Sequence, residues 1–143
     1  MGRRARPALS ILLDTHALVW WLSGAPDRLS ATATAAIGSA DRVLVSPISC
    51  WEVAMLLRSG RIELDRPLGL WIARLTEDAR CDTAPLSPAA AAWAGSIDDG
   101  AFPGDPADRM ILATARDLRV PLVTKDERLH RAARSLGDVR VIW

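Results

Sequence analysis

Four acidic residues occupy positions from which their carboxylates could act together. Asp14 directly follows a short apolar run, and Asp126 comes two residues after another. Glu52 is the only charged residue in segment 47–57, and Asp108 lies near the start of a predicted helix, on the face that carries its apolar residues. A carboxylate beside apolar surface needs a cation, hydrogen bonds or a metal ion to offset the cost of burial. The sequence shows no evident partner cation for all four.

Four converging carboxylates would repel one another strongly unless divalent cations lay among them. Oxygen ligands, in a chain with two histidines and two cysteines that lack C-x-x-C spacing, suit Mg²⁺ or Mn²⁺. A metal ion in such a site binds a phosphate oxygen, activates a water molecule and stabilises the leaving oxygen. The acids therefore predict a metal-dependent phosphodiesterase or phosphatase.

Each acid also has an ordinary structural interpretation, which stays open. An Asp after a strand, such as Asp14 or Asp126, is commonly a turn residue or a helix N-cap. Asp105 precedes a proline and is a candidate N-cap. The negative charge of Asp108 would interact favourably with the positive end of the dipole of the same helix. Glu52 could reach solvent from the rim of its helix.

The elements that must position these acids alternate along the chain. Apolar runs predict buried strands at 9–13, 43–45, 121–124 and 139–143, with a weaker edge strand at 81–86. Caps and prolines predict helices at 15–22, 30–40, 47–58, 67–78, 88–97, 106–118 and 127–136, and a loop at 98–103. This alternation predicts an α/β sandwich around a parallel sheet, with sites at the carboxyl ends of the strands.

Composition narrows the class of protein. With 143 residues, 50% hydrophobic residues and a net charge of +1, the chain is neither a disordered polyelectrolyte nor a strongly basic nucleic-acid coat. We expect one domain over 1–143, with 1–8 as a flexible N-terminus. Cys50 and Cys81 are expected to be reduced. The early apolar run stops at Asp14, so we predict neither a signal peptide nor a membrane span, and a cytoplasmic protein.

One tryptophan, Trp51, carries a further expectation. In helix 47–58, Trp51 stands in an apolar stripe with Ile48, Met55 and Leu56, and Glu52 falls in the same stripe. We therefore expect Trp51 and Glu52 to face the same apolar surface.

The four acids stand in contexts that resemble those of the PIN-domain ribonucleases, and more narrowly the VapC-type toxins of bacterial toxin–antitoxin pairs. These contexts are Leu12-Leu13-Asp14-Thr15-His16, Ser49-Cys50-Trp51-Glu52-Val53, the segment from Asp105 to Thr114, and Thr124-Lys125-Asp126. The similarity runs from Leu12 to Trp143. The ordered set is far more specific than any one motif.

The resemblance implies a three-layer PIN-like sandwich with a central parallel sheet of order 3-2-1-4-5, which brings the first and fourth strands together. It implies that the catalytic, metal-coordinating acids are Asp14, Glu52, Asp108 and Asp126. Thr124 would orient a ligand or water, and Asp105 would be a supporting acid or only the helix cap. For His16 it favours ring stacking or a supporting contact over metal ligation.

The implied activity is endonucleolytic cleavage of RNA with Mg²⁺ or Mn²⁺, in a toxin that inhibits translation. The implied partners are a second copy of the chain and a small VapB-like antitoxin that covers the acidic site. Exposed apolar surface near Trp20, Trp21 and Trp71 is the expected antitoxin contact. A basic rim would hold RNA phosphates, with Arg109, Lys125, Arg128 and Arg131 as its candidates.

Two alternatives remain. A catalytically silent module could keep the fold for protein contact, although the presence of all four acids argues against it. A haloacid-type phosphatase or a phospho-accepting receiver also places an Asp after its first strand. The phosphatase needs a second Asp two residues later, where this chain has His16, and a receiver needs an acid adjacent to the first, which is also missing.

Overall fold

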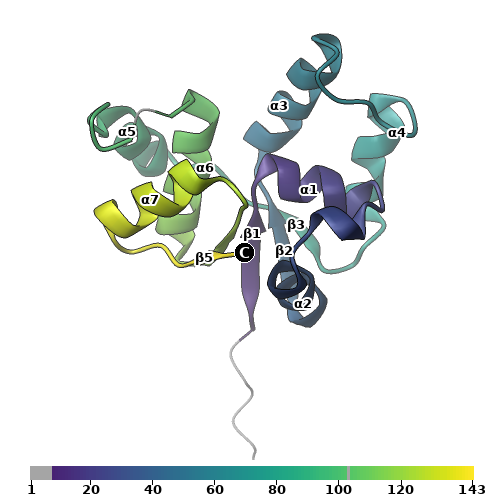
Figure 1. The fold of residues 1–143 in the computed structure, drawn as a ribbon, viewed down its shortest axis with the longest axis horizontal. Helices are drawn as coiled ribbons and strands as arrows, with labels where there is room; N and C mark the ends of the chain where they lie inside the picture. Colours follow the sequence, from purple (N-terminus) through teal and green to yellow (C-terminus); the bar gives the residue numbers. More distant parts are fainter. Residues whose placement is uncertain (1–7, 103) are drawn as a thin grey trace, which may run out of the picture.

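The computed structural model describes residues 8–102 and 104–143 (Figure 1). The expected flexible N-terminus therefore falls, apart from Ala8, outside the described residues. The strands are β1 (Ser10–Leu13), β2 (Arg42–Val45), β3 (Cys81–Thr83), β4 (Leu122–Val123) and β5 (Val141–Ile142). The α-helices are α1 (Thr15–Leu22), α2 (Ala31–Ser39), α3 (Pro47–Arg58), α4 (Leu68–Ala73), α5 (Pro88–Ser96), α6 (Pro106–Leu118) and α7 (Glu127–Leu136). Two 3-10 turns, η1 (Pro26–Arg28) and η2 (Arg74–Thr76), complete the elements.

The strands form one parallel sheet of order β3-β2-β1-β4-β5, as expected. Leu13, the last residue of β1, pairs with Val45 on one side and with Val123 on the other. The carboxyl ends of these three strands are thus level. The residues that follow β1 and β4 therefore emerge side by side.

Both faces of the sheet are covered, which makes the fold a three-layer sandwich. Figure 1 shows α5, α6 and α7 on one side of β1 and α1 to α4 on the other. Ile11 and Leu13 pack toward α1, α2 and the ring of Trp71, whereas Leu12 and Leu122 pack toward α6 and α7. All of these side chains are buried, as expected for strands of a doubly covered parallel sheet.

Helix boundaries follow the predicted caps closely. Ser46, Asp105 and Asp126 cap α3, α6 and α7, and these helices have the predicted bounds. The helix expected at 67–78 is wrong in its second half, where α4 gives way to η2. There the Thr76 hydroxyl donates a 2.8 Å hydrogen bond to the Ala73 carbonyl, a tightening typical of helix ends. The edge strand β3 is shorter than expected, and η1 was not predicted.

The tryptophan expectations are partly wrong. The buried face of α3 carries Ser49, Glu52, Val53 and Leu56, whereas Trp51 is 57% exposed. On this buried face the Thr15 hydroxyl of α1 donates a 3.2 Å hydrogen bond to the Ser49 hydroxyl, and Trp51 lies on the other side of the helix.

Trp71 is fully buried in the core, so it cannot belong to an exposed partner surface. Cys50 and Cys81 are free thiols, as expected. None of the helices in the described parts of the chain has the length and hydropathy that crossing a membrane requires.

Candidate active site

Asp14 joins the end of β1 to the start of α1. Its Oδ1 accepts a 2.8 Å hydrogen bond from the Ala17 backbone N–H and so caps α1. Its Oδ2 accepts a hydrogen bond from the Thr124 hydroxyl, and the side chain is buried. The ordinary interpretation of Asp14 as a helix cap is therefore correct, and the same carboxylate also reaches the end of β4.

Thr124 ties the ends of β1 and β4 together. Besides donating to Asp14, its hydroxyl accepts a 3.1 Å hydrogen bond from the Asp126 backbone N–H. Its carbonyl accepts a 2.7 Å hydrogen bond from the His130 ring of α7. Thr124 is buried, so its hydroxyl is fixed from both directions. In this structure the Thr124 hydroxyl orients the Asp14 carboxylate, and His130 is a supporting residue that no sequence motif marked.

Asp126 caps α7 and pairs with Arg128. Its Oδ1 accepts a 2.9 Å hydrogen bond from the Arg128 backbone N–H, and the Arg128 guanidinium lies 3.2 Å from its Oδ2. The same guanidinium nitrogen lies 3.9 Å from Oδ2 of Asp108. The sequence offered no evident partner for these acids because Arg128 meets Asp108 only through the fold. Arg128 offsets part of the negative charge.

Glu52 and Asp108 approach from helices on opposite sides of the site. Glu52 is only 8% exposed and follows Ser49 by one turn of α3, on the face that contacts α1. Asp108 lies in the first turn of α6 with a side chain that is 17% exposed. No ion pair formed within the described residues includes Glu52.

The pKa of Asp108 is shifted by its burial and by the nearby acids. Burial is the largest influence and, together with the charges of Glu52, Asp126, Asp105 and Asp14, raises the pKa of Asp108 to about 7. Like charges shift a carboxyl pKa upward only when they are near. The structure thus brings the four predicted acids into one electrostatic neighbourhood.

Asp14 and Asp126 respond differently to their surroundings. Burial raises the pKa of Asp14, and the hydrogen bonds from Thr124 and Ala17 offset only part of this effect. Partial burial also acts to raise the pKa of Asp126, but the hydrogen bonds from Arg128 outweigh it and leave the pKa of Asp126 below its usual value. Burial thus favours the protonated form of Asp14, whereas Arg128 favours the charged form of Asp126.

The donor set fits a hard divalent cation. Its side chains offer carboxylate oxygens, the ligands that Mg²⁺ and Mn²⁺ prefer. Across the described ranges, no three acidic, histidine or cysteine side chains are already grouped closely enough to hold a metal ion. A cation would relieve the repulsion that raises the pKa of Asp108.

Asp105 and His16 border the acids. Asp105 caps α6 through a 2.8 Å hydrogen bond from the Ala107 backbone N–H, so the helix-cap interpretation is correct. It is exposed, yet near enough for its charge to act on Asp108. His16 is exposed, and its ring centroid lies 5.8 Å from that of Trp20, in a tilted aromatic contact with an interplanar angle of 50°.

The basic candidates divide into two groups. Lys125, Arg128 and Arg131 are exposed. Arg109 is not: its guanidinium donates to the carbonyls of Ile97 at 2.7 Å and Phe102 at 2.8 Å, and its side chain is 13% exposed. It holds the loop that follows α5, so its expected place in an RNA-binding rim is not supported. No local sequence pattern predicts these hydrogen bonds of Arg109.

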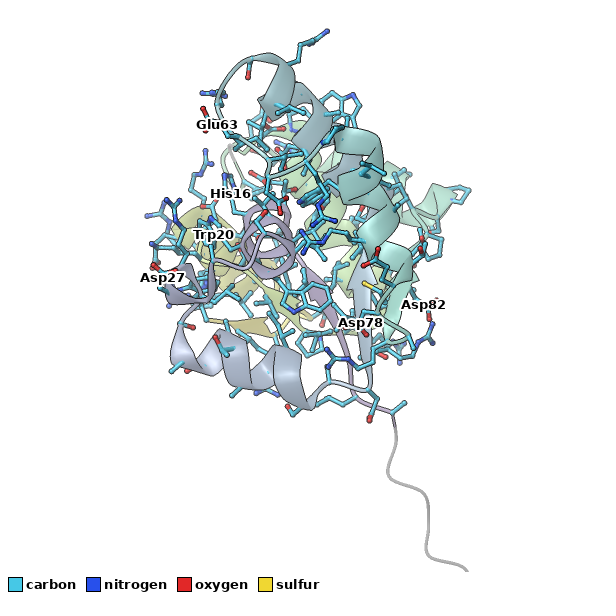
Figure 2. All side chains as sticks on the ribbon, turned by 90° about the vertical axis from the view of Figure 1, so that its right-hand side faces the viewer. His16, Trp20, Asp27, Glu63, Asp78 and Asp82 are labelled. Carbon is cyan, nitrogen blue, oxygen red and sulfur yellow. The ribbon has the colours of Figure 1, made fainter. Side chains whose placement is uncertain are left out.

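A small cavity of about 190 Å³ adjoins the acids. Its lining comes from the ends of β1 and β4 and from one face of α1, and consists of Asp14, His16, Trp20, Lys125 and Asp126. Figure 2 shows His16 and Trp20 on the same side of α1, one turn apart. An acidic edge and an aromatic wall thus share one opening to solvent.

Comparison with known proteins yields a family model and a relative. The family model described as PIN domain matches residues 11–135. The chain is 45% identical over 127 residues to Ribonuclease VapC22 of Mycobacterium tuberculosis, and the match covers 87% of this chain and 95% of that protein.

Solved structures with the same fold are also found. VapBC2 from Rickettsia felis, bound to a DNA fragment from its promoter, aligns with a TM-score of 0.64 at 13% identity, covering 93% of this chain and 97% of that chain. FitAcB from Neisseria gonorrhoeae aligns with a TM-score of 0.54 at 22% identity, covering 92% and 95%. At these identities the structures support the fold.

Proposed function

The chain belongs to the PIN domain family, and from this premise we propose that it is an endoribonuclease dependent on Mg²⁺ or Mn²⁺. The observation that carries the proposal is the convergence of Asp14, Glu52 and Asp126 on Asp108, whose pKa is raised to about 7 by burial first and by these neighbouring charges second. The relative that shares 45% of its residues is named a ribonuclease. The substrate is RNA, and the reaction is hydrolysis of a phosphodiester bond.

In this proposal the four acids share one task, and neighbouring residues position them. Asp14, Glu52, Asp108 and Asp126 would hold the cation, which when bound activates water and neutralises the leaving oxygen. The Ala17 N–H and the Thr124 hydroxyl fix both oxygens of Asp14, so this carboxylate does not have to reorganise. Arg128 lies against Asp126 and Asp108, where it limits their repulsion and can contact a phosphate from the rim.

We propose that the biological role is that of a toxin in a toxin–antitoxin pair, which inhibits translation by cutting RNA in the cytoplasm. The names of the similar proteins support this role, since VapC22 is a ribonuclease and VapBC2 is bound to its promoter DNA. The partner would be a small VapB-like antitoxin, and the toxin would form a homodimer. Trp51 and Leu70, which are 57% and 61% exposed, offer apolar surface for such protein contacts.

A cleavage assay tests the proposal. Purified protein is incubated with a mixed RNA pool in Mn²⁺ or Mg²⁺, with EDTA as one control and Asp14→Asn as another. Glu63→Gln, which removes an exposed acid in the segment between α3 and α4 (Figure 2), is the matched variant. We expect cleavage by the wild type and by Glu63→Gln with metal, and none by Asp14→Asn. Equal cleavage by Asp14→Asn would contradict the assignment, and metal binding without cleavage would favour the silent binding module.

A further inference from the structure

We propose that Trp20, with His16 and Lys125, forms a subsite that stacks one base of a single-stranded RNA beside the acidic site. The inference rests on the proposed function and goes beyond it, because the proposed function assigns the four acids to the sugar–phosphate backbone and assigns no residue to a base. The subsite is the cavity of about 190 Å³ next to Asp14 and Asp126.

Trp20 is held as a fixed platform. Its ring centroid lies 5.8 Å from that of His16 and 5.9 Å from that of Trp143, with interplanar angles of 50° and 57°. Trp143 directly follows β5 and His16 belongs to α1, so contacts from two elements hold the Trp20 ring. A ring that is already fixed loses little conformational freedom when a base stacks on it.

Lys125 supplies positive charge at the same place. Its Nζ lies 5.9 Å from the centroid of the Trp20 ring, and the side chain is exposed. It takes part in none of the ion pairs found among residues 8–102 and 104–143. Lys125 also precedes Asp126, so an RNA phosphate that contacts it would lie next to the acids. An aromatic platform with a free cation beside it is the usual composition of a single-strand binding groove.

The size and position of the cavity favour a base over a peptide. Drug-sized ligands occupy pockets of roughly 300–1,000 Å³, so this cavity suits one flat ring system. A nucleotide whose phosphate contacts the acids would place its base, or that of its neighbour, against Trp20. Because every base has a π face, the subsite would tolerate different bases and act mainly by orienting the strand.

Trp21 provides a matched control on the same helix. It is half-buried like Trp20 but lines a different cavity, of about 370 Å³, together with residues of α2 such as Ile37. Trp20 contributes to the edge of both cavities. Removing the Trp21 ring therefore perturbs the same helix and the same core while leaving the cavity beside Asp14 lined as before.

The test measures binding of a short single-stranded RNA that carries 2-aminopurine, whose fluorescence is quenched by stacking. The parent protein carries Asp14→Asn, which is expected to prevent cleavage. It is compared with four variants that each add one substitution to it: Trp20→Leu, Trp20→Phe, Lys125→Gln or Trp21→Leu. We expect Trp20→Leu to weaken binding about tenfold and abolish the quenching, Trp20→Phe to keep most of both, and Lys125→Gln to weaken binding at low salt. Trp21→Leu should match its parent.

A second measurement varies the RNA and can detect the subsite in a protein whose Trp20 is intact. An abasic residue is placed at each position of the RNA in turn. The Asp14→Asn protein should lose about tenfold in affinity at one position, and Trp20→Leu should be insensitive to that same change. Equal affinity for every abasic RNA would overturn the subsite.

The outcomes separate this inference from the proposed function. If the wild type cleaves RNA and neither Trp20→Leu nor an abasic residue alters binding, the subsite is wrong and the nuclease assignment stands. If the wild type neither binds nor cleaves RNA, both are wrong. If Trp20→Leu leaves RNA binding intact but weakens binding of an antitoxin, Trp20 belongs to a protein interface and the base subsite is rejected.

Discussion

The Thr124 hydroxyl at the end of β4 donates a hydrogen bond to the Asp14 carboxylate at the end of β1, across 110 residues of sequence. This contact exists because β1 and β4 are neighbours in the sheet and end at the same level. It joins the two strands at the site and fixes the most buried of the four acids.

Thr124→Val removes this donor while keeping the shape of the side chain. We expect a loss of about 1–3 kcal/mol in the free energy of unfolding, because a buried acceptor is left unpaired. Cleavage should fall roughly 10–100-fold, as is usual when a support of a metal-binding residue is lost. Thr124→Ser should restore both. Denaturant unfolding and RNA cleavage measure the two effects, and full activity in the valine variant would show that Asp14 does not need Thr124.

The stability of the metal-free protein should fall as pH rises. The pKa of Asp108 is raised to about 7 by burial and by its acidic neighbours, so the folded state holds this proton more tightly than the unfolded chain does. Its deprotonation therefore costs stability between about pH 4 and pH 7, and the cost persists above that. Asp108→Asn should melt several degrees above the wild type at pH 8 in EDTA, for a gain of about 1–2 kcal/mol, and at the wild-type temperature near pH 4.

Asp126→Asn serves as the opposite case. The pKa of Asp126 lies below its usual value because the hydrogen bonds from Arg128 outweigh partial burial, so its negative charge stabilises the fold. Removing the charge should lower the melting temperature at pH 8. A rise for both variants, or for neither, would show that the acids are not arranged as described.

Divalent metal should stabilise the wild type by mass action. When free Mg²⁺ or Mn²⁺ is a hundred times its dissociation constant, the gain is about 2.7 kcal/mol. Thermal melting in EDTA and in rising metal concentration should show this gain for the wild type and for Glu63→Gln, and much less for Asp14→Asn. The same gain in Asp14→Asn would place the cation elsewhere.

Arg109 should contribute to the stability of the fold, and Arg131 to the binding of RNA. Arg109→Gln removes the hydrogen bonds to the Ile97 and Phe102 carbonyls, so we expect a loss of about 2–4 kcal/mol in stability. Its folded form should bind RNA as the wild type does. Arg131→Gln, at an exposed position of α7, should leave stability unchanged and reduce the slope of log affinity against log salt by about 0.7. Unfolding curves and salt titrations of RNA binding distinguish the two.

Local sequence signals predicted most of the secondary structure. Prolines and capping side chains set the starts of α3 and α6, and Asp126 and Gly137 set the two bounds of α7. Which side chains of a helix are buried was harder to predict, since Trp51 and Glu52 occupy adjacent positions and the packing of α3 against its neighbours decides which of the two is buried.

The candidate site was predicted in its acids but not in their partners. An acid beside apolar residues is visible in the sequence because burying a charge is costly. The ion pairs of Arg128 with Asp108, the hydrogen bonds of Arg109 and the support of Thr124 by His130 depend on which elements the fold places together. The order of the strands came from the resemblance to a family, since the apolar runs alone do not fix it.

Three of the acids at or beside the site, Asp14, Asp105 and Asp126, also begin a helix. Most substitutions at these positions would therefore damage the fold and the chemistry in one step. Asparagine is the exception, because its amide oxygen still caps a helix while the charge is lost. Few substitutions could therefore inactivate the nuclease and still leave a folded chain able to bind a partner. Asp→Asn is one of them, and a single-base change can produce it.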